Sequence, residues 1–234
     1  MMPPMIPGAA MIFAAGLGTR MGPLTATRPK PLIEVGGRAL LDHALALVRS
    51  AGVRRIVVNS HAHAAMLEAH LAGASDVTIS HEPERLETGG GLKRALPLLG
   101  PGPVFTLNAD IVWRGENPLL ALGAAWDDAR MDALLCLVPR GAAQGHDGPG
   151  DFFADEDGRL ARRGSAAAAD HVFAGAQIID PAVLAGFAEA AFSLNPAWDR
   201  LIAAGRLHGI VHAGAWVDVG RPEGIALAEA ELAR

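Results

Sequence analysis

Short apolar runs alternate with helical repeats over the first 138 residues, and this alternation constrains the fold more than any other sequence feature. The repeats place apolar residues three and four positions apart, as in 40–48, and the runs are as short as buried strands. Strands joined by such helices form a largely parallel sheet with helices on both faces. The expected strands are 11–15, 55–59, 77–80, 104–107 and 132–138, and the expected helices are 40–48, 62–71, 92–98 and 119–126. Ser60 is the expected cap of the second helix, and 81–91 is expected to be a loop.

The alternation ends at Pro139, where the polar loop 139–150 begins. Residues 155–158 have the composition of a hairpin turn, and later strands are expected at 172–179, 207–212 and 215–218. Further helices are expected after Pro181, from 195 to about 204, and after Pro222. We therefore expect a single domain over 1–234, with a main α/β part at about 10–138, a small antiparallel lobe at about 139–215, and a C-terminal segment at 216–234.

Length and charge narrow the classes of function. The chain has 234 residues, half of them hydrophobic, which suffices for the core of one α/β domain. The net charge of −5 argues against a general nucleic-acid or membrane-surface binder.

The one cysteine, Cys136, lies in an apolar run and is expected in the core. The N-terminal segment MMPPMIPGAA lacks the basic region of a signal peptide, and no apolar stretch is as long as a membrane span, so we expect a cytoplasmic protein.

A glycine-rich loop follows the first expected strand in the stretch MIFAAGLGTRMGPLTATRPKPL, residues 11–32. The backbone N–H groups of such a loop can bind phosphate oxygens, and the small residues before it allow a ligand to approach closely. Arg20 supplies a planar fork for phosphate and Lys30 a compact charge. Two prolines flank Lys30, which predicts an extended backbone there. A dinucleotide fingerprint would need glycine at Met21, and a Walker triplet is missing from the sequence, so the ordinary phosphate-loop motifs do not apply.

Two further clusters are expected at the same edge of the sheet, because ligands bind beyond the carboxyl ends of parallel strands. The segment 88–91, Thr-Gly-Gly-Gly, provides a backbone that a base or ribose can approach. Asp110 follows the fourth strand, and Asp218 ends a late apolar run. Carboxylates so placed are typical ligands of Mg²⁺ next to phosphate. His146, Asp147 and Asp151, in the polar loop, are interpreted as solvent-facing residues, with the lining of a sugar pocket as the alternative.

Taken together, these motifs resemble the signatures of the sugar-1-phosphate nucleotidyltransferases. The resemblance is carried by AAGxGTRM…T…RPKPL, by EPxxLETGGG at 82–91, by LNAD at 107–110 and by WVDVG at 216–220. It covers residues 11 to about 230 and implies a Rossmann-like, GT-A-like nucleotidyltransferase fold. The nucleotide would bind in about 10–138 and the sugar in about 139–215, with the second metal ligand in 216–234.

The resemblance also implies roles for individual residues. Arg20 and Lys30 would act on the reacting phosphates, and Asp110 and Asp218 would share one Mg²⁺. Sugar contacts would come from Asp151, in the segment GDF, and from Gly175. The implied nucleotide-binding residues are Ala14, Ala15, Gly16, Gly18, Thr19, Glu82, Thr88, Gly89 and Asn108.

The implied reaction joins a nucleoside triphosphate to a sugar 1-phosphate and releases pyrophosphate. LETGGG, GDF and WVDVG most resemble the members that use UTP and N-acetylmuramate 1-phosphate in cell-wall recycling. Mannose-1-phosphate guanylyltransferases and glucose-1-phosphate uridylyl- or thymidylyltransferases are the alternatives, and a non-catalytic sugar-nucleotide-sensing subunit is another. Larger members carry a lysine for the sugar phosphate, but this chain has no lysine after Lys93, so Arg28 or Arg162 is expected to replace it.

Overall fold

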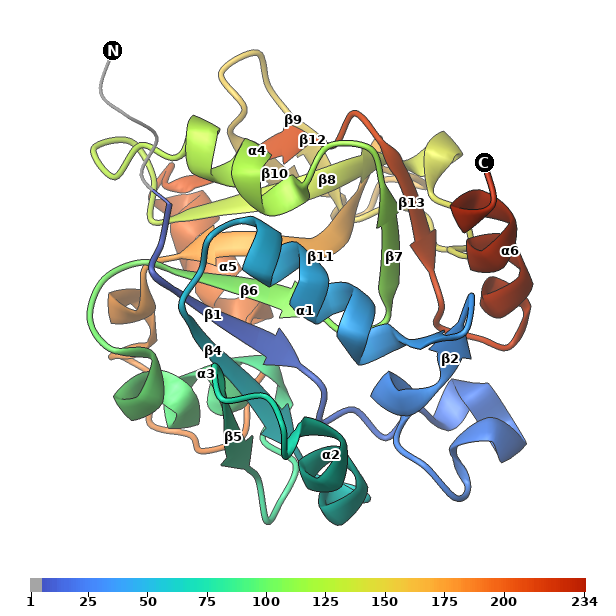
Figure 1. Cartoon of the computed structure of the whole chain (residues 1–234). Helices are drawn as coiled ribbons and strands as arrows, with labels where there is room; N and C mark the ends of the chain where they lie inside the picture. Colours follow the sequence, from blue (N-terminus) through green and yellow to red (C-terminus); the bar gives the residue numbers. More distant parts are fainter. Residues whose placement is uncertain (1–5) are drawn as a thin grey trace.

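The computed structural model describes residues 6–234 (Figure 1). Residues 1–5, part of the N-terminal segment considered above, lie outside the described residues. At the centre of a nine-stranded sheet, β1 (Ala9–Phe13) lies between β6 (Val104–Asn108) and β4 (Arg55–Ser60), and β5 (Val77–His81) follows β4. These four strands run parallel, as the alternation of strands and helices predicts.

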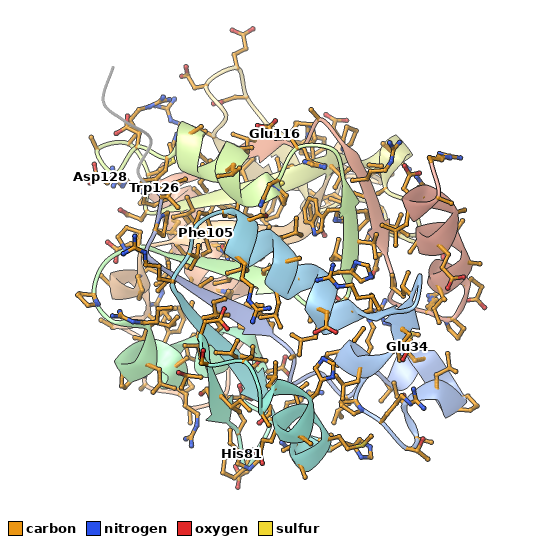
Figure 2. All side chains as sticks on the ribbon, in the orientation of Figure 1. Glu34, His81, Phe105, Glu116, Trp126 and Asp128 are labelled. Atoms are coloured by element: carbon orange, nitrogen blue, oxygen red, sulfur yellow. The ribbon has the colours of Figure 1, made fainter. Side chains whose placement is uncertain are left out.

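The sheet is covered on both faces because its central strand is apolar on both sides. In β1, Ala10 and Ile12 pack into one core, while Ala9 and Met11 pack into a second core on the opposite face. Phe105 of β6 is fully buried inside the fold, whereas Glu34, Glu116 and Asp128 lie at its periphery (Figure 2). The first core is closed by α1 (Leu40–Ser50), α2 (Ala64–Leu71) and α4 (Pro118–Ala125), and the second by α3 (Glu87–Leu99) and α5 (Asn195–Ala203).

The segment after Pro139 continues the same sheet with antiparallel strands. β11 (His171–Ile179) runs antiparallel both to β6 and to β8 (Ala133–Pro139). A hairpin of β9 (Phe152–Ala154) and β10 (Leu160–Arg162) extends the sheet beyond β11. Strand β12 (Leu207–Val211) pairs in parallel with β8. The antiparallel segment therefore shares its hydrogen-bonded framework with the parallel part.

A second, two-stranded sheet packs the C-terminal segment against residues 21–40. β7 (Ile111–Arg114), which the sequence pattern did not reveal, pairs with β13 (Ala215–Asp218), and α6 (Glu223–Leu232) packs against them. Met21 of the glycine loop and Val217 of β13 share a third small core with Ala228 of α6. A minor hairpin is formed by β2 (Glu34–Val35) and β3 (Arg38–Ala39).

Four local predictions were wrong. The side chain of Ser60 bonds to His81 and caps no helix, since α2 begins four residues later. Part of the expected loop 81–91 is helical, because α3 begins at Glu87. The helix expected after Pro181 is only a 3-10 turn, Pro181–Leu184. Lys30 begins another 3-10 turn, Lys30–Leu32, and its backbone is not extended.

Cys136 is buried, as expected, and burial raises the pKa of its thiol to about 12. Within residues 6–234, each helix is too short or too polar to cross a bilayer.

Candidate active site

Asn59, at the end of β4, fixes the start of the glycine loop. Its side-chain oxygen accepts hydrogen bonds from the backbone N–H groups of Ala14, at 2.6 Å, and Ala15, at 3.3 Å. Its side-chain nitrogen donates to the Glu82 carboxylate at 2.7 Å, and that carboxylate also accepts from the Leu86 N–H. Asn59 and Glu82 are both buried, so this network holds the loop in one position.

The next part of the loop keeps its donors available for a ligand. Among the described residues, the N–H groups of Gly16, Leu17 and Gly18 have no hydrogen-bond partner. Gly18 has a φ of +63°, and a Cβ there would lie 2.9 Å from the side chains of both Thr25 and Lys30. Glycine is therefore required at position 18 for the loop to close over Lys30, and successive free N–H groups can bind an anion.

Lys30 is buried beneath this loop and forms an ion pair with Asp110. Its Nζ lies 2.5 Å from Oδ2 of Asp110, which follows β6. The Asp110 side chain keeps 28% of its exposure, whereas that of Lys30 keeps 9%. The pair thus places a positive charge at the floor of the site, next to a carboxylate that a ligand can reach.

Asp218 lies beside Asp110, although the two are far apart in the sequence. It pairs with Ile111 across the β7–β13 ladder, and the Val219 N–H donates to the Asp110 carbonyl at 3.0 Å. Burial and the neighbouring Asp110 carboxylate raise the pKa of Asp218, while Lys30, Arg20 and His146 oppose that shift. A Cβ at Gly220 would lie about 3 Å from both the Asp218 carboxylate and the Arg20 guanidinium, so these two groups meet at one point.

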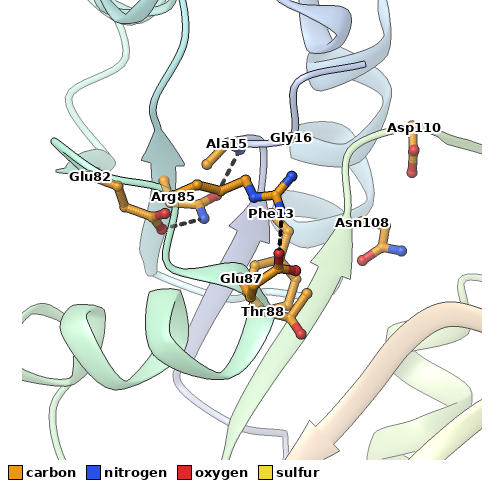
Figure 3. Close-up of a pocket in the computed structure, with 10 residues that line it drawn as sticks. Phe13, Ala15, Gly16, Glu82, Arg85, Glu87, Thr88, Asn108 and Asp110 are labelled. Carbon is orange, nitrogen blue, oxygen red and sulfur yellow. Dashed lines mark hydrogen bonds and ion pairs between the residues drawn. The ribbon is translucent and has the colours of Figure 1, made fainter. Parts of the chain in front are cut away.

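A cavity of about 220 Å³ opens between the glycine loop and α3 (Figure 3). Figure 3 shows Arg85 extended across it toward Glu87, with which it forms an ion pair of 2.6 Å. Glu87 has a φ of +61°, a region that few residues other than glycine occupy, and such strain is typical of functional sites. The lining residues are Phe13, Ala15, Gly16, Asn59, Glu82, Arg85, Glu87, Thr88, Asn108 and Asp110.

A second cavity, of about 380 Å³, adjoins the first, since Phe13, Glu87, Thr88 and Asn108 line both. Its other walls come from the antiparallel part of the sheet and from α5. They are Thr106, His146, Asp151, Phe152, Arg162, Val172, Phe173, Gln177, Ser193, Leu194, Asn195 and Trp198. Two ligands can therefore bind end to end across the carboxyl edge of β1 and β6.

The predicted site residues divide into two groups. Those that line the first or second cavity are Ala15, Gly16, Glu82, Thr88, Asn108, Asp110 and Asp151. Arg20 and Asp218 line a third cavity, of about 210 Å³, together with His146 and Asp147, and Lys30 is buried beneath the glycine loop and paired with Asp110. The others, Ala14, Gly18, Thr19, Gly89 and Gly175, line none of the described cavities.

Two residues of this second group, Gly89 and Gly175, make close packing contacts next to the cavities. The Gly89 N–H donates to the Phe192 carbonyl at 2.8 Å, and its Cα faces the Phe192 ring. Gly175, at a bulge in β11 with a φ of +84°, leaves room for the Asn108 side chain. Of the loop residues interpreted as solvent-facing, Asp147 is exposed, as expected, whereas His146 lines the second cavity, which corrects that interpretation.

The sequence reasoning missed Asn59, Arg85, Glu87 and Trp198. A polar residue at the end of an apolar strand is the signal that marks Asn108 and Asp110, and the same signal is present at Asn59. Arg85 and Glu87 lie inside the motif EPERLETGGG, but the Glu87 strain has no signature in sequence. Trp198 resembles an ordinary core residue, and only its hydrogen bond to buried Gln177, at 3.0 Å, places it at the cavity wall.

The two aspartates fit a single Mg²⁺. Among residues 6–234 no cluster of three or more His, Cys, Asp or Glu side chains is arranged to hold a metal, so this pair would supply two carboxylates at most. Burial is the main cause of the raised pKa of Asp218, and the adjacent Asp110 carboxylate, whose charge a divalent cation would neutralise, is the second. Mg²⁺ usually takes one or two carboxylates and completes its ligands with water and phosphate oxygens.

Comparisons with known proteins agree with this geometry. A model of the MobA-like NTP transferase domain matches residues 10–186. The chain is 44% identical to an N-acetylmuramate alpha-1-phosphate uridylyltransferase of Caulobacter vibrioides, over 97% of this chain and 98% of that protein. It is 34% identical to the protein of the same name in Neisseria meningitidis, over 90% and 92% of the two chains. The solved inositol-1-phosphate CTP transferase of T. maritima has the same fold, with a TM-score of 0.79, 14% identity, and 99% and 98% coverage.

Proposed function

The chain belongs to the MobA-like NTP transferase family, and from this premise we propose that it transfers the uridylyl group of UTP to N-acetylmuramate 1-phosphate. The observation that carries the proposal is the pair of adjoining cavities with charged groups at their edge. UTP occupies the first cavity and the sugar phosphate the second. The products are UDP-N-acetylmuramate and pyrophosphate.

In the reaction, a phosphate oxygen of the acceptor forms a bond to the α-phosphorus of UTP. The bond from that phosphorus to the bridging oxygen breaks, and pyrophosphate leaves from the opposite side. The free N–H groups of Gly16–Gly18 and the Arg20 guanidinium bind the β- and γ-phosphates. Lys30 supplies positive charge beside the transferring phosphoryl group, and no covalent enzyme intermediate is needed.

Asp110 and Asp218 hold Mg²⁺ in this proposal, and Mg²⁺, when bound, neutralises charge on the α-phosphate. Asn59 and Glu82 keep the glycine loop in place for the base and ribose. The walls of the second cavity, including Asp151, orient the sugar so that its phosphate faces the first cavity. We further propose a cytoplasmic role in peptidoglycan recycling, because UTP is made and used in that compartment.

The test is a matrix of UTP, dTTP, CTP and GTP against the 1-phosphates of N-acetylmuramate, N-acetylglucosamine, mannose and glucose. Pyrophosphate release is measured with Mg²⁺, and Lys30→Ala protein controls for contaminating enzymes. The proposal requires UTP with N-acetylmuramate 1-phosphate to give the highest kcat/KM. If GTP with mannose 1-phosphate is best, the guanylyltransferase alternative is correct. No turnover with any pair would favour a sensing subunit.

A further inference from the structure

Arg162 forms part of the second cavity wall at the end far from the ion pair of Lys30 and Asp110. It is the last residue of β10, and several contacts hold its guanidinium in place. Nε donates to the Asp199 carboxylate at 2.7 Å, and Nη2 donates to the backbone and side-chain oxygens of Asn195 at 3.1 and 3.0 Å. The guanidinium also lies 4.9 Å from the centre of the Phe152 ring and 5.6 Å from that of Trp198.

These contacts leave one edge of the guanidinium available. Nη1 of Arg162 has no hydrogen-bond partner among residues 6–234. Arg162 is also the one arginine or lysine among the residues that line this cavity. Its partner Asp199 has a side chain that is 58% exposed, so water solvates much of that opposing charge. A partly buried, oriented guanidinium with a free edge is suited to a carboxylate or another planar anion.

The position of Arg162 in the sheet decides which anion this is. The order β10-β9-β11-β6 puts its strand three steps away from β6, the strand that leads to Asp110. At about 4.8 Å per step the two strands are roughly 14 Å apart. A phosphate held next to Asp110 and a group bound at Arg162 are therefore expected at opposite ends of the second cavity. The group at Arg162 must be a different part of the acceptor, across the sugar ring from its phosphate.

We propose that Arg162 binds a carboxylate substituent of the acceptor sugar and thereby selects acidic sugar 1-phosphates over neutral ones. This inference rests on the function proposed above, under which the substituent is the lactyl ether carboxylate of N-acetylmuramate 1-phosphate. Phe152 and Trp198 fix the plane of the guanidinium, while Asp199 and Asn195 fix its rotation. Arg162 is thus a specificity-determining residue and takes no part in the bond exchange.

The experiment compares two acceptors that differ only in the lactyl group, N-acetylmuramate 1-phosphate and N-acetylglucosamine 1-phosphate, with saturating UTP. In Arg162→Gln, the KM for the first should rise on the order of 10- to 100-fold, as expected for the loss of a charged hydrogen bond. The KM for the second should change less than about twofold, so that selectivity collapses. Arg159→Gln is the matched control, because Arg159 is on the same hairpin, is exposed and pairs only with Asp157.

The possible results separate a failure of the Arg162 inference from a failure of the proposed function. Equal losses with both acceptors, at an unchanged melting temperature, would show that Arg162 acts on the shared phosphate or ring and would overturn the inference alone. Unchanged kinetics with both acceptors would overturn it as well. Calorimetric binding of N-acetylmuramate 1-phosphate in the presence of a non-hydrolysable UTP analogue checks that the KM change reflects affinity. Wild-type protein that does not use N-acetylmuramate 1-phosphate would instead refute the proposed function.

Discussion

Lys30 illustrates how a single residue is prepared for its role by its surroundings. The glycine at position 18 allows the loop to pack on the Lys30 stem, and Asp110 orients the ammonium group. A lysine so enclosed has little rotamer freedom left to lose when a substrate binds. Its charge is therefore preorganised for the transferring phosphoryl group.

Replacing Lys30 with alanine should lower kcat about 100- to 1000-fold, because it removes charge stabilisation from the transition state. The measurement is steady-state pyrophosphate release under saturating substrates. Lys93→Ala is the matched control, since Lys93 is the only other lysine. Its Nζ donates to the Phe187 carbonyl, and it lines neither the first nor the second cavity. Turnover of Lys30→Ala within a few-fold of wild type would refute this assignment.

His208 should make the protein less stable in mild acid. Burial, together with the positive charges of Arg130 and Arg159, lowers the pKa of His208, and neither ring nitrogen has a partner among the described residues. Below the ordinary value of 6.5 the unfolded chain binds a proton that the folded chain does not. The free energy of unfolding is therefore lost as the pH falls from about 6.5 toward the lower folded pKa.

Urea unfolding at about pH 7.5 and about pH 5.5 measures this loss, which should be smaller in His208→Leu than in wild type. His70→Leu, which removes an exposed histidine paired with Asp42, should leave the loss in place. An identical pH dependence in wild type and His208→Leu would show that other groups are responsible. His212 is a further candidate, because burial also lowers its pKa.

At the scale of elements, the first turns of α3 show glycines used for packing. Gly89 and Gly90 donate their N–H groups to the Phe192 carbonyl, and a Cβ at Gly90 would lie 2.1 Å from the Ala190 carbonyl oxygen. The helix thus approaches the segment before α5 closely, and this contact positions Thr88 and Glu87 at the cavities. The Thr88 hydroxyl accepts the Leu194 N–H at 2.9 Å, which locks the same contact.

Gly90→Ala should lower the free energy of unfolding by about 1–3 kcal/mol, because overpacking outweighs the usual helix-propensity gain from alanine. Chemical denaturation measures the change. Gly73→Ala is the control, since a Cβ there meets nothing within 4 Å and the φ is not positive. Its stability should stay level or rise slightly. A Gly90→Ala protein as stable as wild type would mean that the segment before α5 moves aside without cost.

At the scale of the whole molecule, Asp110 and Asp218, the proposed Mg²⁺ ligands, connect the central sheet to the C-terminal segment. Asp110 follows the central sheet, while Asp218 arrives on β13, which is held by β7 and by the small core shared with α6. Glu231 of α6 reinforces this junction through an ion pair with Arg114 of β7, at 2.6 Å. The C-terminal segment is therefore part of the site as well as of the fold.

Asp218→Asn should raise the melting temperature in Mg²⁺-free buffer near neutral pH, because the raised pKa of Asp218 means that its ionised form is unfavourable in the folded state. Mg²⁺ with a non-hydrolysable UTP analogue should then stabilise wild type more than Asp218→Asn. Thermal unfolding with and without both ligands measures the two effects. Asp157→Asn, on the distant hairpin turn, is the control. Equal Mg²⁺-dependent stabilisation in wild type and Asp218→Asn would contradict the shared site.

Elements whose signals are local could be predicted from the sequence. The apolar patterns of α1 and of β1, β4, β5 and β6 predict a helix and parallel strands, and the family motifs pointed to Arg20, Lys30, Asp110 and Asp218. These signals suffice to predict an element because the apolar pattern of a buried strand or an amphipathic helix lies within a short stretch of neighbouring residues. The edge location of the site also followed, since parallel strands end together at one edge.

Features that depend on partners far away in the sequence became visible only in the folded structure. β7, which the sequence pattern did not reveal, pairs along its whole length with β13, whose residues lie about a hundred positions away. The antiparallel entry of β11 between β6 and β8, the Asn59–Glu82 network and the packing of Gly89 have the same character. Each depends on a backbone or buried polar group whose partner lies far away in the sequence, and such groups must find a partner once water is excluded. The pattern of neighbouring residues in the sequence does not identify that partner. The contacts that support the site can therefore be found only in the folded structure.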